Sequence, residues 1–267
     1  MSVFEGFRFR RVFSPVHQLD PRVKFFYVCA IFVIAVLFNQ LLPLILLFFI
    51  QLPFVLLAGV QREWVRSLKG ASFLAVMIFL FNFVFTYFYR EYPKFPPSSQ
   101  LIEYALAMTL RFLVLVESFS VFFLTTSPDR LGLALEQSHV PYEFCFAFTT
   151  AVRFVPVLAE EAQTIMDAQK ARGLELERGN FIKRIKNYIP ILIPLIVSAI
   201  RRSLELAEAM ESRAWGATDK RTNLYVLKVK RGDYILVTIS VVMLILAAYI
   251  WLFMRYQIPS LTALLTA

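Results

Sequence analysis

Residues 25–60 form a run of 36 residues that are almost all apolar. One helix needs only about 20 apolar residues to cross the hydrocarbon core of a bilayer, so this run is too long for a single crossing. Asn39, Gln40 and Pro43 interrupt it near the middle. The run therefore predicts two short membrane helices, at about 25–38 and 42–60, joined outside the membrane. Tilting of the helices or local thinning of the bilayer would accommodate their length.

Three later runs, at about 71–89, 101–125 and 234–254, are also apolar enough to span a membrane. The whole chain of 267 residues is 58% hydrophobic and 18% charged, whereas a soluble domain is nearer half apolar and a quarter charged. We therefore expect an all-α, polytopic membrane protein with five transmembrane helices. A cleavable signal peptide is not expected, because Pro15, His17, Asp20 and Pro21 precede the first apolar run.

Charged residues divide the chain into three predicted parts. Residues 126–232 hold 16 Lys/Arg and 12 Asp/Glu, more than half of all charged residues, and lie between the fourth and fifth predicted spans. The expected organisation is four spans in 1–125, a cytoplasmic domain of long amphipathic helices in 126–232, and a last span in 233–267. Basic residues also flank the spans at 1–24, 61–69 and 218–231, which by the positive-inside rule places the N-terminus in the cytoplasm and the C-terminus outside.

One short pattern occurs twice in the predicted cytoplasmic domain. Residues 168–173 and 209–214 each read Ala-x-x-small-Arg-small, 41 residues apart, at the end of an apolar-periodic helical run. A single copy is typical of ordinary helix C-capping, in which a basic residue in the last turn complements the helix dipole. Two copies favour binding to two equivalent acceptors, such as the two subunits of a dimer. The small neighbours allow close approach of a partner, and each guanidinium suits a bidentate contact with a carboxylate. The candidate partner-binding residues are Ala171, Arg172, Gly173, Ser212, Arg213 and Ala214.

Catalytic and metal-binding patterns are absent from the sequence. It contains no GxxxxGK[ST], HExxH or GxSxG motif, and its two histidines and two cysteines form no ligand cluster. We expect no catalytic residue, no metal site and no cofactor. Glu160 and Glu161 are interpreted as a solvated helix face. Two alternatives stay open: a membrane-embedded hydrolase, and a self-contained permease using Arg111 and Glu117 of the fourth span. Burial against a neighbouring helix is the ordinary interpretation of those two residues.

Four stretches together resemble the transmembrane (T) component of energy-coupling factor transporters, the family that includes the cobalt-transport permease subunit. The resemblance covers nearly the whole chain. It is carried by His17-x-Leu19-Asp20-Pro21-Arg22-x-Lys24, by Arg153-Phe154-x-Pro156 with Ala168-Gln169-x-Ala171-Arg172-Gly173, by Ile189-Pro190-x-Leu192-x-Pro194-Leu195, and by Ala209-Met210-Glu211-Ser212-Arg213-Ala214. In the second arginine motif the glycine comes later, at Gly216, which leaves open how that helix ends.

The resemblance implies a coupling subunit of an importer in the plasma membrane of a prokaryote. In that family two long coupling helices end in X-Arg-X motifs, which sit in grooves of two ABC-type ATPase subunits. Their movement is passed to a small membrane-embedded S component that binds a vitamin or a metal ion. By this resemblance the six motif residues dock ATPases, and the apolar stretches 144–158 and 188–200 seat the S component. The lipid bilayer is a further partner, and nucleic acid is not expected.

Overall fold

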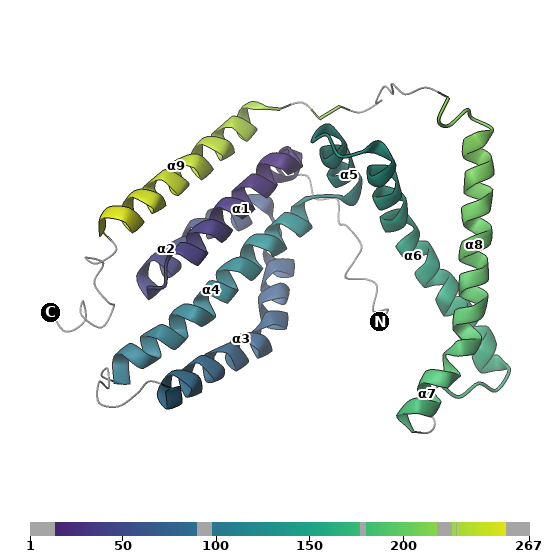
Figure 1. Cartoon of the computed structure of the whole chain (residues 1–267), viewed down its shortest axis with the longest axis horizontal. Coiled ribbons are helices and arrows are strands. Elements are labelled where there is room, and N and C mark those ends of the chain that lie inside the picture. The colour runs from purple at the N-terminus through teal and green to yellow at the C-terminus, as the bar shows by residue number, and fades with distance from the viewer. Residues whose placement is uncertain (1–13, 90–97, 177–179, 218–225, 228, 255–267) are drawn as a thin grey trace. The chain divides into compact units, whose positions relative to one another are not determined.

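The computed structural model describes residues 14–89, 98–176, 180–217, 226–227 and 229–254. Over these residues the regular structure is helical, and Figure 1 shows how the helices follow one another along the chain. Their bounds are η2 Val16–Gln18, α1 Pro21–Leu37, α2 Leu41–Ala58, α3 Gln61–Tyr89, α4 Ser98–Thr125, α5 Pro128–Gln137, α6 Tyr142–Ala171, α7 Phe181–Asn187, α8 Ile189–Glu211 and α9 Arg231–Met254. Parts of two predicted basic flanks lie outside the described residues: residues 1–13 of the flank at 1–24, and most of the flank at 218–231.

The chain divides into two compact units, with the boundary inside α5. One unit, residues 135–226, contains α6, α7 and α8, and we call it the α6–α8 unit. The other, residues 9–134 with 227–267, contains α1 to α4 and α9, and we call it the α1–α4/α9 unit. The predicted boundaries at 125/126 and 232/233 stay a prediction.

The long apolar run of 25–60 forms two helices, as predicted. Asp20 caps α1, because its carboxylate accepts the backbone N–H of Arg22 at 2.9 Å, and Pro21 occupies the first helical position. The helix ends at Leu37, before Asn39 and Gln40, and α2 begins at Leu41. Gly59 then ends α2 in the left-handed conformation, with φ of 70°, which a residue without Cβ adopts easily.

The third helix starts earlier than predicted. The segment 61–69, expected as a cytoplasmic link before a span at 71–89, is the first part of the continuous helix α3. Glu63 lies in its first turn, where a negative charge is favourable, and no glycine or proline occurs between Gln61 and Lys69. The basic residues of this segment therefore flank the apolar part of α3 from within the same helix.

Helix α4 packs against α1, α2 and α3, and α9 packs against α1. The buried core of this unit joins apolar side chains of α1, α2, α4 and α9 with Phe38, which follows α1. Its members are Tyr27, Ile31, Ile34, Ala35, Phe38, Leu41, Leu44, Leu47, Ala107, Val114, Leu236 and Ala247. Outward-facing apolar residues are abundant, as expected for helices surrounded by lipid.

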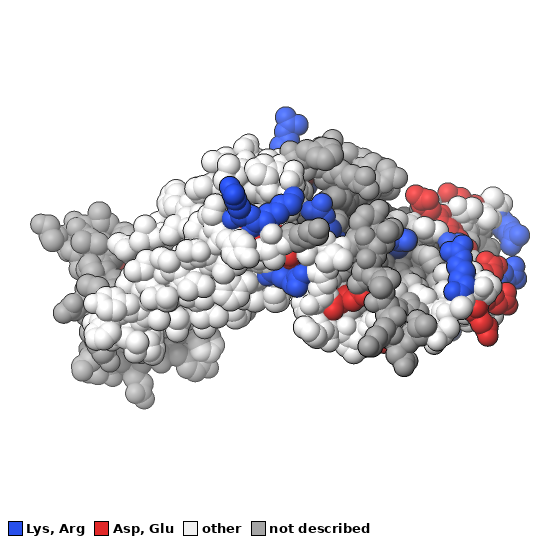
Figure 2. All heavy atoms as spheres, turned by 90° about the horizontal axis from the view of Figure 1, so that it is seen from above, with Lys and Arg blue, Asp and Glu red and all other residues white. Residues whose placement is uncertain are grey.

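Five of the described helices are long and apolar enough to cross a membrane: α2, α3, α4, α6 and α9. The number agrees with the predicted five, but the set differs. Helix α1 has 17 residues, or about 26 Å of rise, which lies at the lower limit of the length for a crossing, so α1 is not among these five. Helix α6, predicted as a cytoplasmic amphipathic helix, meets the length and composition criteria instead. The protein is thus an all-α polytopic membrane protein. Figure 2 shows mostly uncharged side chains over the α1–α4/α9 unit and mixed charge over α6–α8.

Candidate functional site

The first arginine motif closes helix α6 with a Schellman motif. The backbone N–H of Leu174 donates to the carbonyl of Gln169 at 3.0 Å, and that of Gly173 donates to Lys170 at 2.9 Å. Gly173 has φ of 89°, in the left-handed region, and Arg172 is the C-cap residue. The glycine thus turns the chain away directly after the arginine, so the guanidinium is carried at the tip of the helix.

The second motif closes α8 with the same pair of hydrogen bonds. The N–H of Trp215 donates to Met210 at 3.0 Å, and the N–H of Ala214 donates to Glu211 at 2.9 Å. Regular helix ends at Glu211, with Ser212 as its C-cap residue, but these bonds place Arg213 where Arg172 lies in the first motif. Ala214 occupies the position of Gly173, with φ of 55°. The helix therefore ends at the motif although its glycine, Gly216, comes later.

All six candidate residues, Ala171, Arg172, Gly173, Ser212, Arg213 and Ala214, are exposed. Within the part of the chain that the structure describes, neither Arg172 nor Arg213 forms a side-chain hydrogen bond or ion pair. Each guanidinium therefore keeps its donors for a partner, whose carboxylate or carbonyl groups it can meet in a bidentate contact.

Helices α6 and α8 pack antiparallel, which places the two arginines at opposite ends of the pair. Near the end of α6, the Gln169 side chain donates from Nε2 to the carbonyl of Pro190, at the start of α8, at 3.1 Å. Near the end of α8, Trp215 packs against two rings at the start of α6. Its ring centroid lies 4.5 Å from that of Phe146 and 5.3 Å from that of Tyr142. The 23 residues of α8 correspond to about 34 Å, so the two tips are far apart.

The middle of the pair holds a polar contact that sequence analysis missed. Glu161 accepts a hydrogen bond from the Ser198 hydroxyl, and its second oxygen lies 3.1 Å from Nη2 of Arg202. The Arg202 guanidinium also lies over the Phe154 ring, 5.9 Å from its centroid. Glu160 is exposed, so the predicted solvated face holds for that residue but not for half-buried Glu161. The sequence does carry a signal for this contact: Glu161 and Arg202 are 41 residues apart, the same separation as Arg172 and Arg213.

A broad apolar surface runs along α8. Its exposed side chains follow helical spacing through the stretch predicted to seat a partner: Ile189, Leu192, Ile193, Ile196, Val197, Ile200 and, further on, Leu204, each 46 to 59% exposed. Phe144, Val155 and Val157 of α6 are exposed as well. An apolar surface of this extent indicates a lipid or protein partner.

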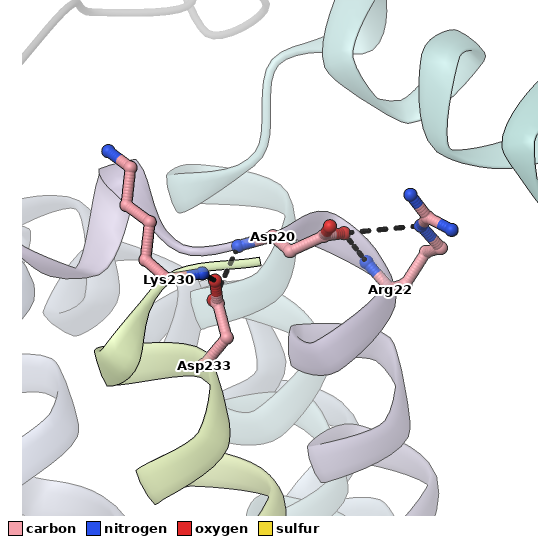
Figure 3. A network of polar contacts seen from close by, with 4 residues as sticks. All are labelled: Asp20, Arg22, Lys230 and Asp233. Carbon is pink, nitrogen blue, oxygen red and sulfur yellow. Dashed lines mark hydrogen bonds and ion pairs between the residues drawn. The ribbon is translucent and has the colours of Figure 1, made fainter. Parts of the chain in front are cut away.

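The predicted His17–Lys24 motif forms a polar junction between the N-terminal ends of α1 and α9 (Figure 3). Buried Asp233 accepts the backbone N–H of Asp20 at 2.8 Å and that of Lys230 at 2.6 Å. On the other side of Asp20, its carboxylate lies 3.4 Å from Nε of Arg22. The motif residues therefore serve to join the two helices.

Two other residues of the motif, Lys24 and His17, bond to the end of α4 and to α5. The Lys24 ammonium donates to the carbonyl of Thr125 at 2.9 Å, and Arg130 donates to that of His17 at 2.6 Å. Burial and the nearby positive charges of Lys24 and Arg130 lower the pKa of His17, and a hydrogen bond that the ring donates to the backbone of Leu124 opposes this shift.

Arg111 and Glu117 have separate surroundings. Nη2 of Arg111 donates to the carbonyl of Phe38 at 2.7 Å and to Oδ1 of Asn39 at 2.6 Å, so the arginine ties α4 to the connection after α1. Glu117 is completely buried. Burial against neighbouring helices, the ordinary interpretation, therefore holds for Glu117, whereas Arg111 is only half-buried. Among the described residues no group of three or more His, Cys, Asp or Glu could hold a metal ion.

Comparisons with known proteins agree with the resemblance. The cobalt transport protein family, CbiQ, matches residues 13–224. The chain is 34% identical over 247 residues to the energy-coupling factor transporter transmembrane protein EcfT of Lactococcus lactis, covering 87% of this chain and 92% of the relative. It is 31% identical over 262 residues to EcfT of Staphylococcus aureus, covering 94% and 96%, and 33% identical over 257 residues to EcfT of Thermotoga maritima, covering 90% and 92%. The chain therefore belongs to the CbiQ/EcfT family of transmembrane transport proteins.

Proposed function

We propose that this protein is the coupling subunit of an energy-coupling factor importer, and that Arg172 and Arg213 each dock one of two ABC-type ATPase subunits. In this role the chain hydrolyses nothing itself. ATP binding and hydrolysis occur in the partner subunits, and α6 and α8 carry the resulting movement to a membrane-embedded S component. The names of the EcfT relatives support the transport role.

The observation that carries the docking role is the identical closure of the two helix ends. Leu174 and Trp215 make the same hydrogen bond to the residue five positions before them, and in both motifs an exposed arginine lies just before the turn. Ordinary helix C-capping would explain an arginine at one such helix end. Two matched ends on an antiparallel pair present equivalent groups to two sites, as a dimer of ATPase subunits would require.

The apolar surface of α8 is the proposed seat of the S component. It extends from Ile189 to Leu204, and the same helix ends at the second arginine motif. A partner on this surface would be connected directly to the ATPase contact through one continuous helix. The transported vitamin or metal ion is recognised by that partner, so its identity is not encoded in this chain.

The proposed location is the plasma membrane of a prokaryote, with the N-terminus in the cytoplasm. Basic residues support this orientation: Arg22 and Lys24 begin α1, Arg62 and Lys69 lie in the first part of α3, and Arg231 begins α9. We propose that both arginine motifs also face the cytoplasm, where ATP is available, which requires that α6 does not cross the membrane although it is long and apolar enough to do so.

The experiment is co-purification of the ATPases with an Arg172→Glu, Arg213→Glu double variant, together with substrate uptake by cells. The account predicts normal levels of the variant in the membrane, loss of the ATPase subunits and loss of uptake. A matched control changes exposed basic residues of α7, as Lys183→Glu with Arg184→Glu. Retention of the ATPases and of uptake by the motif variant would show that the docking role is wrong.

A further inference from the structure

Helices α6 and α8 are related by an internal two-fold pattern. The two arginines are 41 residues apart, and five half-buried residues of α6 have half-buried counterparts in α8 at the same offset. In both helices these side chains follow spacings of four, three, four and four residues, which keeps them on one face. The matched pairs are Phe154 with Leu195, Leu158 with Ala199, Glu161 with Arg202, Ile165 with Leu206, and Gln169 with Met210.

Glu161 and Arg202 lie at the centre of this pattern and contact one another, at 3.1 Å. Residues at equivalent positions of two related elements contact each other where the symmetry axis passes. Glu161 precedes Arg172, and Arg202 precedes Arg213, by the same eleven residues, about three helical turns. The ion pair is thus equally far along each helix from the arginine at its tip.

The chemistry of this contact requires that the symmetry is broken. Two identical charges at an axis would repel each other, whereas this chain has a carboxylate on α6 and a guanidinium on α8. The Ser198 hydroxyl and the Phe154 ring complete the surroundings of the pair, and each of them fixes one side chain. An arginine held on one side by a carboxylate and on the other by a ring has a defined orientation. The contact therefore ties the two helices together at their crossing point.

We propose that Glu161 and Arg202 are a positioning pair on a pseudo-two-fold axis, which holds Arg172 and Arg213 in register with a two-fold-symmetric pair of ATPase subunits. The inference rests on the proposed docking function. A chain that binds through two tips gains the benefit of the second contact only if its geometry lets both engage together. A shift in the crossing of α6 and α8 moves the two tips relative to each other and removes this benefit.

The test uses the complete transporter with the variants Glu161→Arg, Arg202→Glu and the double charge swap, measuring substrate transported per ATP hydrolysed. Each single change is expected to lower this ratio at least threefold at normal membrane levels, because two like charges then meet at the axis. The swap is expected to restore at least half of the wild-type ratio, because the two positions are equivalent. The matched control makes the same changes one residue earlier, as Glu160→Arg and Arg201→Glu, where both side chains are exposed.

A distance measurement keeps the test decisive if a single variant transports poorly for another reason. Spin labels at the equivalent exposed positions Lys170 and Glu211, in a chain with Cys29→Ala and Cys145→Ala, report the separation of the tips. The distance distribution should widen or shift in the single variants and return in the swap. Single variants that behave like the controls, or a swap that does not restore either readout, would overturn the pairing. Failure of the docking proposal is separate: the Arg172, Arg213 double variant would then retain its ATPases.

Discussion

Asp233 accepts a hydrogen bond from the backbone N–H of Asp20 at 2.8 Å, joining residues 213 positions apart. Its other oxygen accepts the N–H of Lys230 at 2.6 Å, and the side chain is completely buried. One carboxylate thus caps the start of α9 and holds it against the start of α1 (Figure 3).

Replacing Asp233 with asparagine should therefore destabilise the protein by about 1–3 kcal/mol, because an amide cannot accept with both of its terminal atoms. Thermal unfolding of the purified protein in detergent would measure the change. Glu208→Gln, at an exposed position of α8, is the control and should leave the midpoint unchanged. Equal midpoints for the two variants would contradict the role given to Asp233.

Exchanging alanine and glycine at the two helix ends should have opposite effects. Ala214 has φ of 55°, in a conformation that costs a residue with Cβ about 1 kcal/mol, so Ala214→Gly should stabilise the end of α8. Gly173→Ala should destabilise the end of α6 by about 1 kcal/mol. That cost would come from the backbone alone, because a Cβ at Gly173 meets no atom within 4 Å. Hydrogen exchange at Leu174 and Trp215 would report each end, and effects of the same sign would contradict the matched geometry.

Trp215→Ala should loosen the packing of the end of α8 against the start of α6. The substitution removes ring contacts with Phe146 and Tyr142, and the expected cost is about 2 kcal/mol. Trp215→Phe, which keeps a ring, should lose less. Thermal unfolding and protease sensitivity of residues 135–226 would measure both variants. Equal stability of the alanine and phenylalanine variants would show that these rings do not hold the pair together.

Stability should fall in mild acid because of His17. Its pKa is lowered in the folded protein, so the unfolded chain binds a proton more readily near the ordinary value of 6.5. The contribution of neutral His17 to the free energy of unfolding is therefore intact above pH 6.5. It is lost as the pH falls below that value, where the imidazolium would face Lys24 and Arg130. His17→Gln should reduce the difference between the unfolding midpoints at pH 7.5 and pH 5. If the variant shows the same difference between the two midpoints as the wild type, the acid sensitivity comes from other groups.

Much of the fold followed from apolar runs and their interruptions. Asn39, Gln40 and Pro43 divide a run too long for one helix, and the structure separates α1 from α2 at that place. The predicted start of the third helix was wrong because the charged segment 61–69 was treated as a link between helices. In the structure this segment is helical and forms the first turns of α3. Helix α6 was harder to classify, since it combines an apolar first half with an amphipathic second half and meets the criteria for a span.

The arginine motifs were visible in the sequence because they repeat, whereas their supporting contacts were not. The bond between Asp20 and Asp233 joins distant residues without any shared pattern, and the left-handed conformation of Ala214 contradicts the local preference of alanine. The contact between Glu161 and Arg202 could have been found by continuing the 41-residue offset backwards from the motifs. It was missed because a carboxylate on an amphipathic helix is usually solvated.

The most direct test of the central claim is the affinity of purified ATPase subunits for this protein in nanodiscs. Arg172→Glu and Arg213→Glu should each raise Kd at least tenfold, since each removes one of two linked contacts, and the double variant should show no measurable binding. The Lys183→Glu, Arg184→Glu variant should bind like the wild type. Wild-type affinity of the double arginine variant would contradict the account, because ATPase binding would then not depend on the two helix tips.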